Sequence, residues 1–96
     1  MSKHTPGPWN LYDDTASTGR IEIVALGKTV ARIYRSVPEE DLPNARLIAA
    51  APDLLEALRG VVAMIDSLNS AYGSEQVDSV VSNGRAVIAK ATGEQA

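Results

Sequence analysis

The most constraining feature of the sequence is an apolar stripe in its second half. Its members follow one another at alternating spacings of four and three residues: Leu54, Leu58, Val61, Ile65, Leu68 and Tyr72. This heptad-like spacing places the side chains on one side of an α-helix. Leu55 and Val62 widen the stripe beyond what one neighbouring helix covers. We therefore expect a long amphipathic helix that packs against more than one neighbour.

A shorter helix is expected just before the long one. Pro43 suits a first helical turn and the residues after it are helix formers, so this helix is predicted to begin near Asp41. Pro52 disfavours helical geometry at Ala51 and itself suits the first turn of a new helix. The sequence thus predicts a bend between the two helices.

A last helix is predicted over residues 75–91. Gly73 marks the end of the preceding helix and Ser74 is a candidate N-cap. One side of the last helix carries Val77, Val81, Gly84, Ile88 and Ala91. A glycine in a helix interior costs roughly 1 kcal/mol, so we interpret Gly84 as a point of close approach to the long helix. The two helices should form a helical hairpin.

The strand signals lie between residues 9 and 35. Residues 9–12 are a candidate first strand, residues 13–19 are polar and turn-rich, and residues 21–25 and 29–34 alternate apolar with other side chains. With Leu26 to Lys28 as a three-residue connection, the predicted pairs are Ala25 with Thr29, Ile23 with Ala31, Ile21 with Ile33 and Glu22 with Arg32. This register points one apolar face inward, whereas a two-residue turn at Gly27 and Lys28 would mix the faces.

These elements predict an α+β fold. An antiparallel β-hairpin or small three-stranded sheet over residues 9–35 precedes the short helix and helical hairpin of residues 41–91. The 96 residues are expected to form a single domain. Residues 1–8, with Pro6 and Pro8, should form an extended arm, and residues 92–96 a frayed tail.

Composition narrows the classes of partner. The net charge of −3 and the pI near 5.0 make duplex DNA an unlikely ligand. Cysteine is absent, the N-terminus has no apolar signal core, and no stretch is long and apolar enough to span a membrane. We therefore expect a cytoplasmic protein that does not bind membranes. With no phenylalanine the core must consist of Leu, Ile, Val and Ala, a narrow basis for stability that favours a homo-oligomer.

No catalytic apparatus is recognisable. His4 is the only histidine, it lies in the arm, and no cysteine accompanies it, so neither a metal site nor an acyl-transfer base is predicted. The glycine-rich phosphate-binding motifs are absent. Glu39, Glu40 and Asp41 are interpreted as favourable charges at a helix start. We expect no enzyme, no cofactor, no catalytic residue and no metal ligand.

Guanidinium and aromatic groups are the candidate ligand-binding residues, because together they can stack a base and neutralise a phosphate. They are Trp9, Arg32, Tyr34, Arg35 and Arg46. Each also has a structural interpretation. Trp9 could close one end of the core, Arg32 could pair with Glu22, and Arg35 and Arg46 could be surface charges.

Two segments resemble a family of small proteins found in phage and prophage genomes. They are HTPGPW at residues 4–9 and NARLIAAAPDLLEAL at residues 44–58, and residues 89–93 are similar to the C-terminal helix end of that family. The strand region between the two segments is variable in the family. The resemblance implies an accessory protein acting in the bacterial host cell, in a class rich in counter-defence factors.

In size and layout the chain also resembles the phage sponge proteins of the Thoeris anti-defence type. The resemblance implies an oligomer that holds a cyclic nucleotide or cyclic ADP-ribose derivative between protomers without cleaving it. The alternatives are an inhibitor of a host defence protein, of anti-CRISPR type, a structural or regulatory accessory protein, and a weak DNA binder, which the net charge disfavours.

Overall fold

The computed structural model describes residues 3–72 and 75–93, and the side chains of residues 70–72 are outside the description. The chain divides into two compact units, residues 5–53 and residues 54–96 with 1–4. The single domain expected from the sequence stays a prediction. Within the described residues, no helix is both long and apolar enough to cross a membrane.

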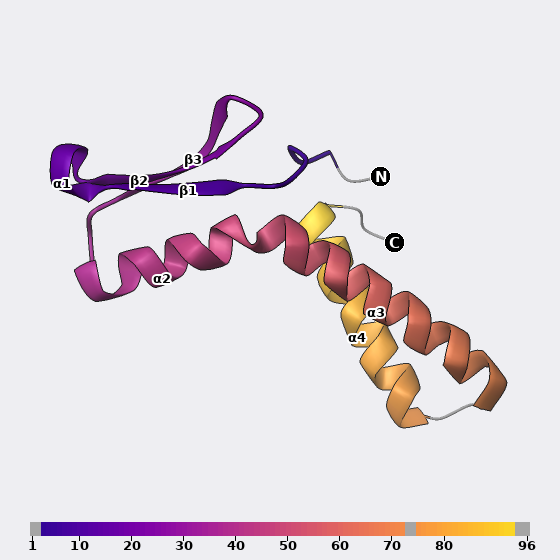
Figure 1. Ribbon diagram of the computed structural model, residues 1–96. Coiled ribbons are helices and arrows are strands. Elements are labelled where there is room, and N and C mark those ends of the chain that lie inside the picture. The colour runs from indigo at the N-terminus through magenta and orange to yellow at the C-terminus, as the bar shows by residue number, and fades with distance from the viewer. Residues whose placement is uncertain (1–2, 73–74, 94–96) are drawn as a thin grey trace. The chain divides into compact units, whose positions relative to one another are not determined.

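The first unit contains a three-stranded antiparallel sheet in the order β1-β2-β3 (Figure 1). Strand β1 is Asn10–Asp14, β2 is Arg20–Ala25 and β3 is Lys28–Tyr34. The predicted polar turn of residues 13–19 is shorter than expected, because β1 extends to Asp14 and a single helical turn, α1 (Thr15–Thr18), follows it. Gly19 ends this turn with a φ of 72°, a conformation that glycine adopts at little cost. The α+β prediction is confirmed, with the sheet in its three-stranded form.

The predicted register between β2 and β3 is right at one end and wrong at the other. Ile21 pairs with Ile33, Glu22 with Arg32 and Ile23 with Ala31, as expected. Beyond Ile23 the register shifts, so that Val24 pairs with Thr29 and Ala25 with Lys28 instead of Thr29. The connection is a two-residue turn at Leu26 and Gly27, whose φ angles are 53° and 75°. The register shift leaves one residue of β3 without a partner on β2. A two-residue turn can therefore join strands whose paired apolar side chains still face inward.

The core of this unit lies between β2 and the helix α2 (Pro38–Ala49), which runs along one face of the sheet (Figure 1). Ile21 and Ile23 of β2 and Ala45 of α2 are almost fully buried. Around them pack partly buried side chains: Trp9, Leu11, Val30, Ala31, Ile33, Leu42, Ile48 and Ala49. Because side chains of a strand point alternately to its two faces, the residues of β2 next to Ile21 and Ile23 lie on the opposite face of the sheet, which α2 does not cover.

Helix α2 begins at Pro38 and not near Asp41 as predicted. Pro38 occupies the first turn, and Pro43, predicted for that turn, lies inside the helix. Asp41 is 6% exposed and accepts hydrogen bonds from the backbone N–H groups of Ser36 (3.0 Å) and Val37 (3.3 Å). Its carboxylate thus satisfies donors before the helix, which allows the helix to start three residues earlier.

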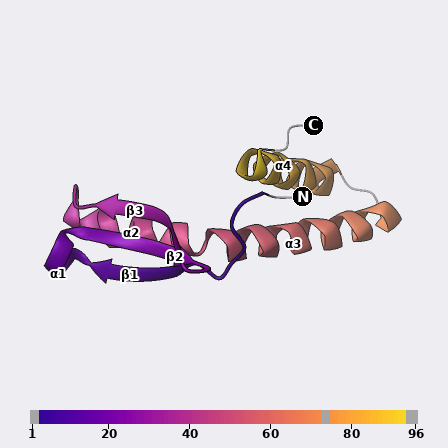
Figure 2. The ribbon, with the colours of Figure 1, turned by 90° about the horizontal axis from the view of Figure 1, so that it is seen from above.

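The second unit consists of a pair of helices, α3 (Ala51–Tyr72) and α4 (Glu75–Thr92), seen side by side in Figure 2. A helix boundary lies where the bend was predicted, because α2 ends at Ala49 and α3 begins at Ala51. The bend itself stays a prediction. Gly84 is a close-approach point as predicted, since a Cβ built there would lie 2.6 Å from Val62 Cγ2. The predicted helix stop at Gly73, the cap at Ser74 and the tail from residue 94 onward lie outside the described residues.

The long apolar stripe of α3 divides into two parts. Leu54, Val61 and Leu68 are more than half exposed, whereas Val62 is buried and Leu58 lies beside Gly84 of α4. On α4, Val81 is buried but Ala91, predicted for the same side, is exposed. One neighbouring helix therefore covers only part of the stripe, as its width predicted.

Candidate functional site

The face of the sheet opposite α2 gathers two rows of polar and aromatic side chains. Because paired residues of antiparallel strands share a face, the register places Asp14, Arg20 and Tyr34 in one row and Tyr12, Glu22 and Arg32 in the next. We call these six residues the outer face. Tyr12 is 58% exposed and Tyr34 62% exposed, so both phenol rings are available to a ligand.

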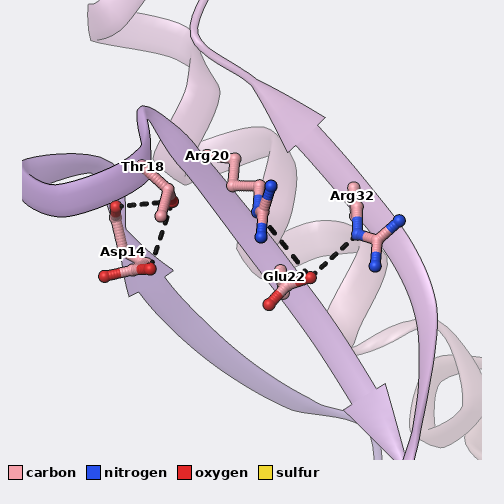
Figure 3. Close-up of polar contacts among 5 residues, drawn as sticks. All are labelled: Asp14, Thr18, Arg20, Glu22 and Arg32. Carbon is pink, nitrogen blue, oxygen red and sulfur yellow. Dashed lines mark hydrogen bonds and ion pairs between the residues drawn. The ribbon is translucent and has the colours of Figure 1, made fainter.

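Glu22 organises the charges of the outer face. Arg32 donates a hydrogen bond from Nε to Glu22 Oε1 at 2.8 Å, and Arg20 Nε lies 3.9 Å from the same oxygen (Figure 3). The hydrogen bond from Arg32, with the charges of Arg20 and Arg32, lowers the pKa of Glu22. The same bond raises the pKa of Arg32. The carboxylate between two guanidinium groups holds both of them on one face.

Arg20 is the least satisfied cation of the outer face. Among the described residues, its Nε is a buried nitrogen without a hydrogen-bond partner, although the side chain as a whole is 37% exposed. Because Nε itself is buried, a ligand oxygen could accept hydrogen bonds only from the exposed part of this guanidinium.

The acidic residues at the end of β1 have structural partners. Thr18 Oγ1 lies 3.0 Å from the carbonyl oxygen of Asp14 and 3.1 Å from its Oδ2 (Figure 3). Asp13 accepts hydrogen bonds from the hydroxyl of Thr15 at 2.7 Å and from its N–H at 3.1 Å, and these bonds lower the pKa of Asp13. Both carboxylates therefore fasten the turn that leads into β2.

Of the candidates predicted from the sequence, the structure brings Arg32 and Tyr34 together on the outer face. Arg20 and Tyr12 complete it and were missed, although the predicted Glu22 to Arg32 pair already implied that Arg20, two residues before Glu22, shares its face.

Arg35 belongs to a different place. Its side chain lines a pocket of about 160 Å³ together with Asp13, Thr15, Ile21, Pro38, Asp41 and Leu42, and its N–H donates to Gly19 O at 3.0 Å. Sites that enclose small organic ligands usually have roughly 300–1,000 Å³. This pocket is thus too small to enclose a nucleotide.

Trp9 and Arg46 also lie away from the outer face. Trp9 packs against the buried cluster of Ile21, Ile23 and Ala45, and its Nε1 donates to Thr5 O at 2.9 Å. These contacts favour its structural interpretation, while a role in ligand binding stays a prediction. Arg46 is exposed and follows the buried Ala45 on α2, the helix that covers the opposite face.

Among the described residues there is no group of three histidine or acidic side chains that could hold a metal ion.

The comparisons with known proteins give one match. The model of a family described as Salmonella phage P22 protein Y8K6 matches residues 1–95. No curated protein and no solved structure matches the chain.

Proposed function

The chain belongs to the family of Salmonella phage P22 protein Y8K6, and we propose that it is a phage counter-defence protein that binds its ligand without altering it. The ligand is a nucleotide-type immune signal, such as a cyclic nucleotide or a cyclic ADP-ribose derivative. The protein acts in the bacterial host cell by lowering the free concentration of this signal.

One observation carries the proposal: two guanidinium groups and two exposed phenol rings share the outer face. Arginine forms paired hydrogen bonds to phosphate oxygens, and aromatic rings stack on bases of any sequence. The carboxylates nearby favour binding over catalysis, because Glu22 is ion-paired and Asp13 and Asp14 hold a turn. The pocket beside Arg35 is too small to enclose such a ligand, and the proposal places the ligand between the outer face and a second protomer.

The test is thermal unfolding with a panel of cyclic dinucleotides, cyclic trinucleotides and cyclic ADP-ribose isomers. A ligand at a hundred times its Kd stabilises the native state by about 2.7 kcal/mol, a Tm shift on the order of 10 °C for a chain of this size. Arg32→Gln should abolish the shift. Arg46→Gln removes the same charge from the α2 side and is the matched control. Ligand recovered after denaturation should have an unchanged mass, and a cleaved product would contradict sequestration.

A second function, inhibition of a host defence protein, is favoured by the composition of the same face. Tyrosine and arginine are enriched among the residues that dominate protein interfaces, and an open sheet face suits a flat partner. No Tm shift with any compound of the panel would reject the sponge. Capture of one host protein by the native chain and by Arg46→Gln, but not by Arg32→Gln, would then establish the inhibitor.

A further inference from the structure

The helical pair α3·α4 exposes large apolar side chains on both helices. These side chains are each 52–66% exposed: Leu54, Val61, Met64 and Leu68 on α3, and Val80 and Val87 on α4. At 100° per residue, the four α3 residues and the exposed Ala57 fall within an arc of about 80°. We call this set of seven residues the open seam. It repeats with the heptad spacing of a helix interface.

The opposite side of the helical pair is polar. Arg85 forms an ion pair with Asp66, and Asn69 donates a hydrogen bond to Asp78. In two antiparallel right-handed helices, the angular position of a residue around each helix decides on which side of the pair it lies. These positions place Arg85 and Asp66 on one side of the pair. They place Val80 and Val87, with the seam residues of α3, on the other side. The pair therefore has one side closed by polar contacts and one side that carries the open seam, where the uncharged Gln76 and Asn83 of α4 lie beside Val80 and Val87.

We propose that the open seam is the contact surface for a second copy of this chain. The copies are related by a two-fold axis that passes Val61 at right angles to the helices, so that α3 packs antiparallel on its partner's α3. Val61 then meets its own copy and Leu54 meets Leu68. The small Ala57 lies within one residue, about 1.5 Å, of the height of the large Met64 on the partner, which lets the two surfaces interdigitate.

Helix α4 fits the same axis. Antiparallel pairing of α4 with its copy brings Val80 opposite Val87, with the midpoint next to Gly84. Gly84 lies beside Val62 of α3, because a Cβ at Gly84 would be 2.6 Å from Val62 Cγ2. The midpoints of both helices are thus at nearly the same height, and one axis serves both. The product is an antiparallel four-helix bundle.

Size and charge are adequate for such a contact. Helix α4 has 18 residues, which at 1.5 Å per residue makes a face about 27 Å long. Two helices spaced 8–10 Å apart make it roughly 18 Å wide, or on the order of 500 Å² in projection per copy. Standard interfaces bury about 800 Å² of accessible surface per partner, so this contact corresponds to a small, dissociable dimer interface. The contact brings no like charges directly together, because the seam contains no charged residue.

The cross-linking test uses the absence of cysteine from the chain. Val61→Cys should form a disulfide-linked dimer on mild oxidation, because the two positions meet at the axis. Ala63→Cys, also exposed but on another side of α3, should remain monomeric on denaturing gels. Leu54→Cys mixed with Leu68→Cys should give a mixed dimer. Leu54→Cys alone should give none, since its two copies would lie about 21 Å apart.

A second measurement does not depend on chemical reactivity. Light scattering should give the wild type twice the 10.2 kDa mass of the chain. Val61→Glu, which brings two carboxylates together at the axis, should raise the dimer dissociation constant by about tenfold or more. Ala63→Glu should leave it unchanged. A monomeric wild type, a dimer that tolerates Val61→Glu, or cross-linking of Ala63→Cys as readily as Val61→Cys would each overturn the proposal.

Discussion

Replacing Gly84 by alanine tests how closely α3 and α4 approach. The added Cβ would lie 2.6 Å from Val62 Cγ2 and 3.8 Å from Leu58 Cδ1. An ordinary carbon contact is about 3.5–4.0 Å, so the helices must separate locally by about 1 Å. Val62 cannot turn away easily, because a β-branched side chain in a helix has one preferred rotamer and Val62 is buried.

The expected magnitude is a balance of two effects. Alanine in place of glycine stabilises a helix interior by roughly 1 kcal/mol, while overpacking costs about 1–3 kcal/mol. Gly84→Ala should therefore change the free energy of unfolding by between about 0 and −2 kcal/mol. Gly60→Ala is the matched control, because nothing lies within 4 Å of a Cβ at Gly60 and only the propensity gain of about 1 kcal/mol applies.

Urea unfolding followed by far-ultraviolet circular dichroism measures both variants. All samples must have the same protein concentration, since association adds to the apparent stability. The difference between the two variants isolates the packing cost, and Val62→Ala should relieve that cost in a double-mutant cycle. If Gly84→Ala stabilises the protein as much as Gly60→Ala does, the close approach of the helices is refuted.

Three further predictions concern the first unit. Leu26→Asn should stabilise the protein by about 1 kcal/mol in urea unfolding, because Leu26 has a φ of 53° and an Asn-Gly pair suits this turn; a loss of stability would contradict the turn. Asp41→Asn should destabilise it by roughly 1–3 kcal/mol, since the buried carboxylate accepts backbone N–H groups, whereas Glu40→Gln on the exposed side should change it by less than about 0.5 kcal/mol. Hydrogen bonds lower the folded-state pKa of Glu22 and of Asp13. Both groups therefore add to the free energy of unfolding above the ordinary carboxyl range near about pH 4, and this contribution is lost as the pH falls through the lowered pKa values. Glu22→Gln should make stability less dependent on pH in that acid range, and an unchanged pH profile would exclude the ion pair as a cause.

The alternation of apolar residues made the strand pairs around Ile21 and Ile23 predictable. The turn between β2 and β3 was not predictable, because it contains a local irregularity. Ile21 and Ile23 can face the core in only one register, so the pairs near them followed from the sequence. The turn did not, because Leu26 adopts a left-handed conformation that leucine rarely takes and the register shift after Ile23 compensates for the short turn. Both features become visible only when the strands are paired.

The start of α2 and the composition of the outer face could not be predicted from the sequence pattern either, because each depends on contacts that form only in the folded chain. Pro43 was predicted to lie in the first turn of α2, but the helix begins earlier. The N–H groups of Ser36 and Val37 donate to the Asp41 carboxylate, and these hydrogen bonds decide where α2 begins. Arg32 and Tyr34 could be grouped by their spacing of two residues along one strand. Trp9 and Arg46 could not be separated from them, because that requires knowing which face of the sheet α2 covers.

The two segments that carry the phage-family resemblance meet in the folded first unit. A Cβ at Gly7, in the first segment, would lie 3.4 Å from the Cβ of Pro52, in the second. Trp9 of the first packs on the cluster that contains Ala45 of the second. Both segments therefore build the core and its α2 side.

The outer face does not contribute to the core, so substitutions on it can test function without removing core contacts. Its side chains point away from α2, so exchanging Tyr12 or Arg32 tests the proposed ligand contacts while the buried cluster keeps its partners. Trp9 is a poor probe of binding, because replacing it takes apolar contacts from the core and any loss of binding would follow from unfolding.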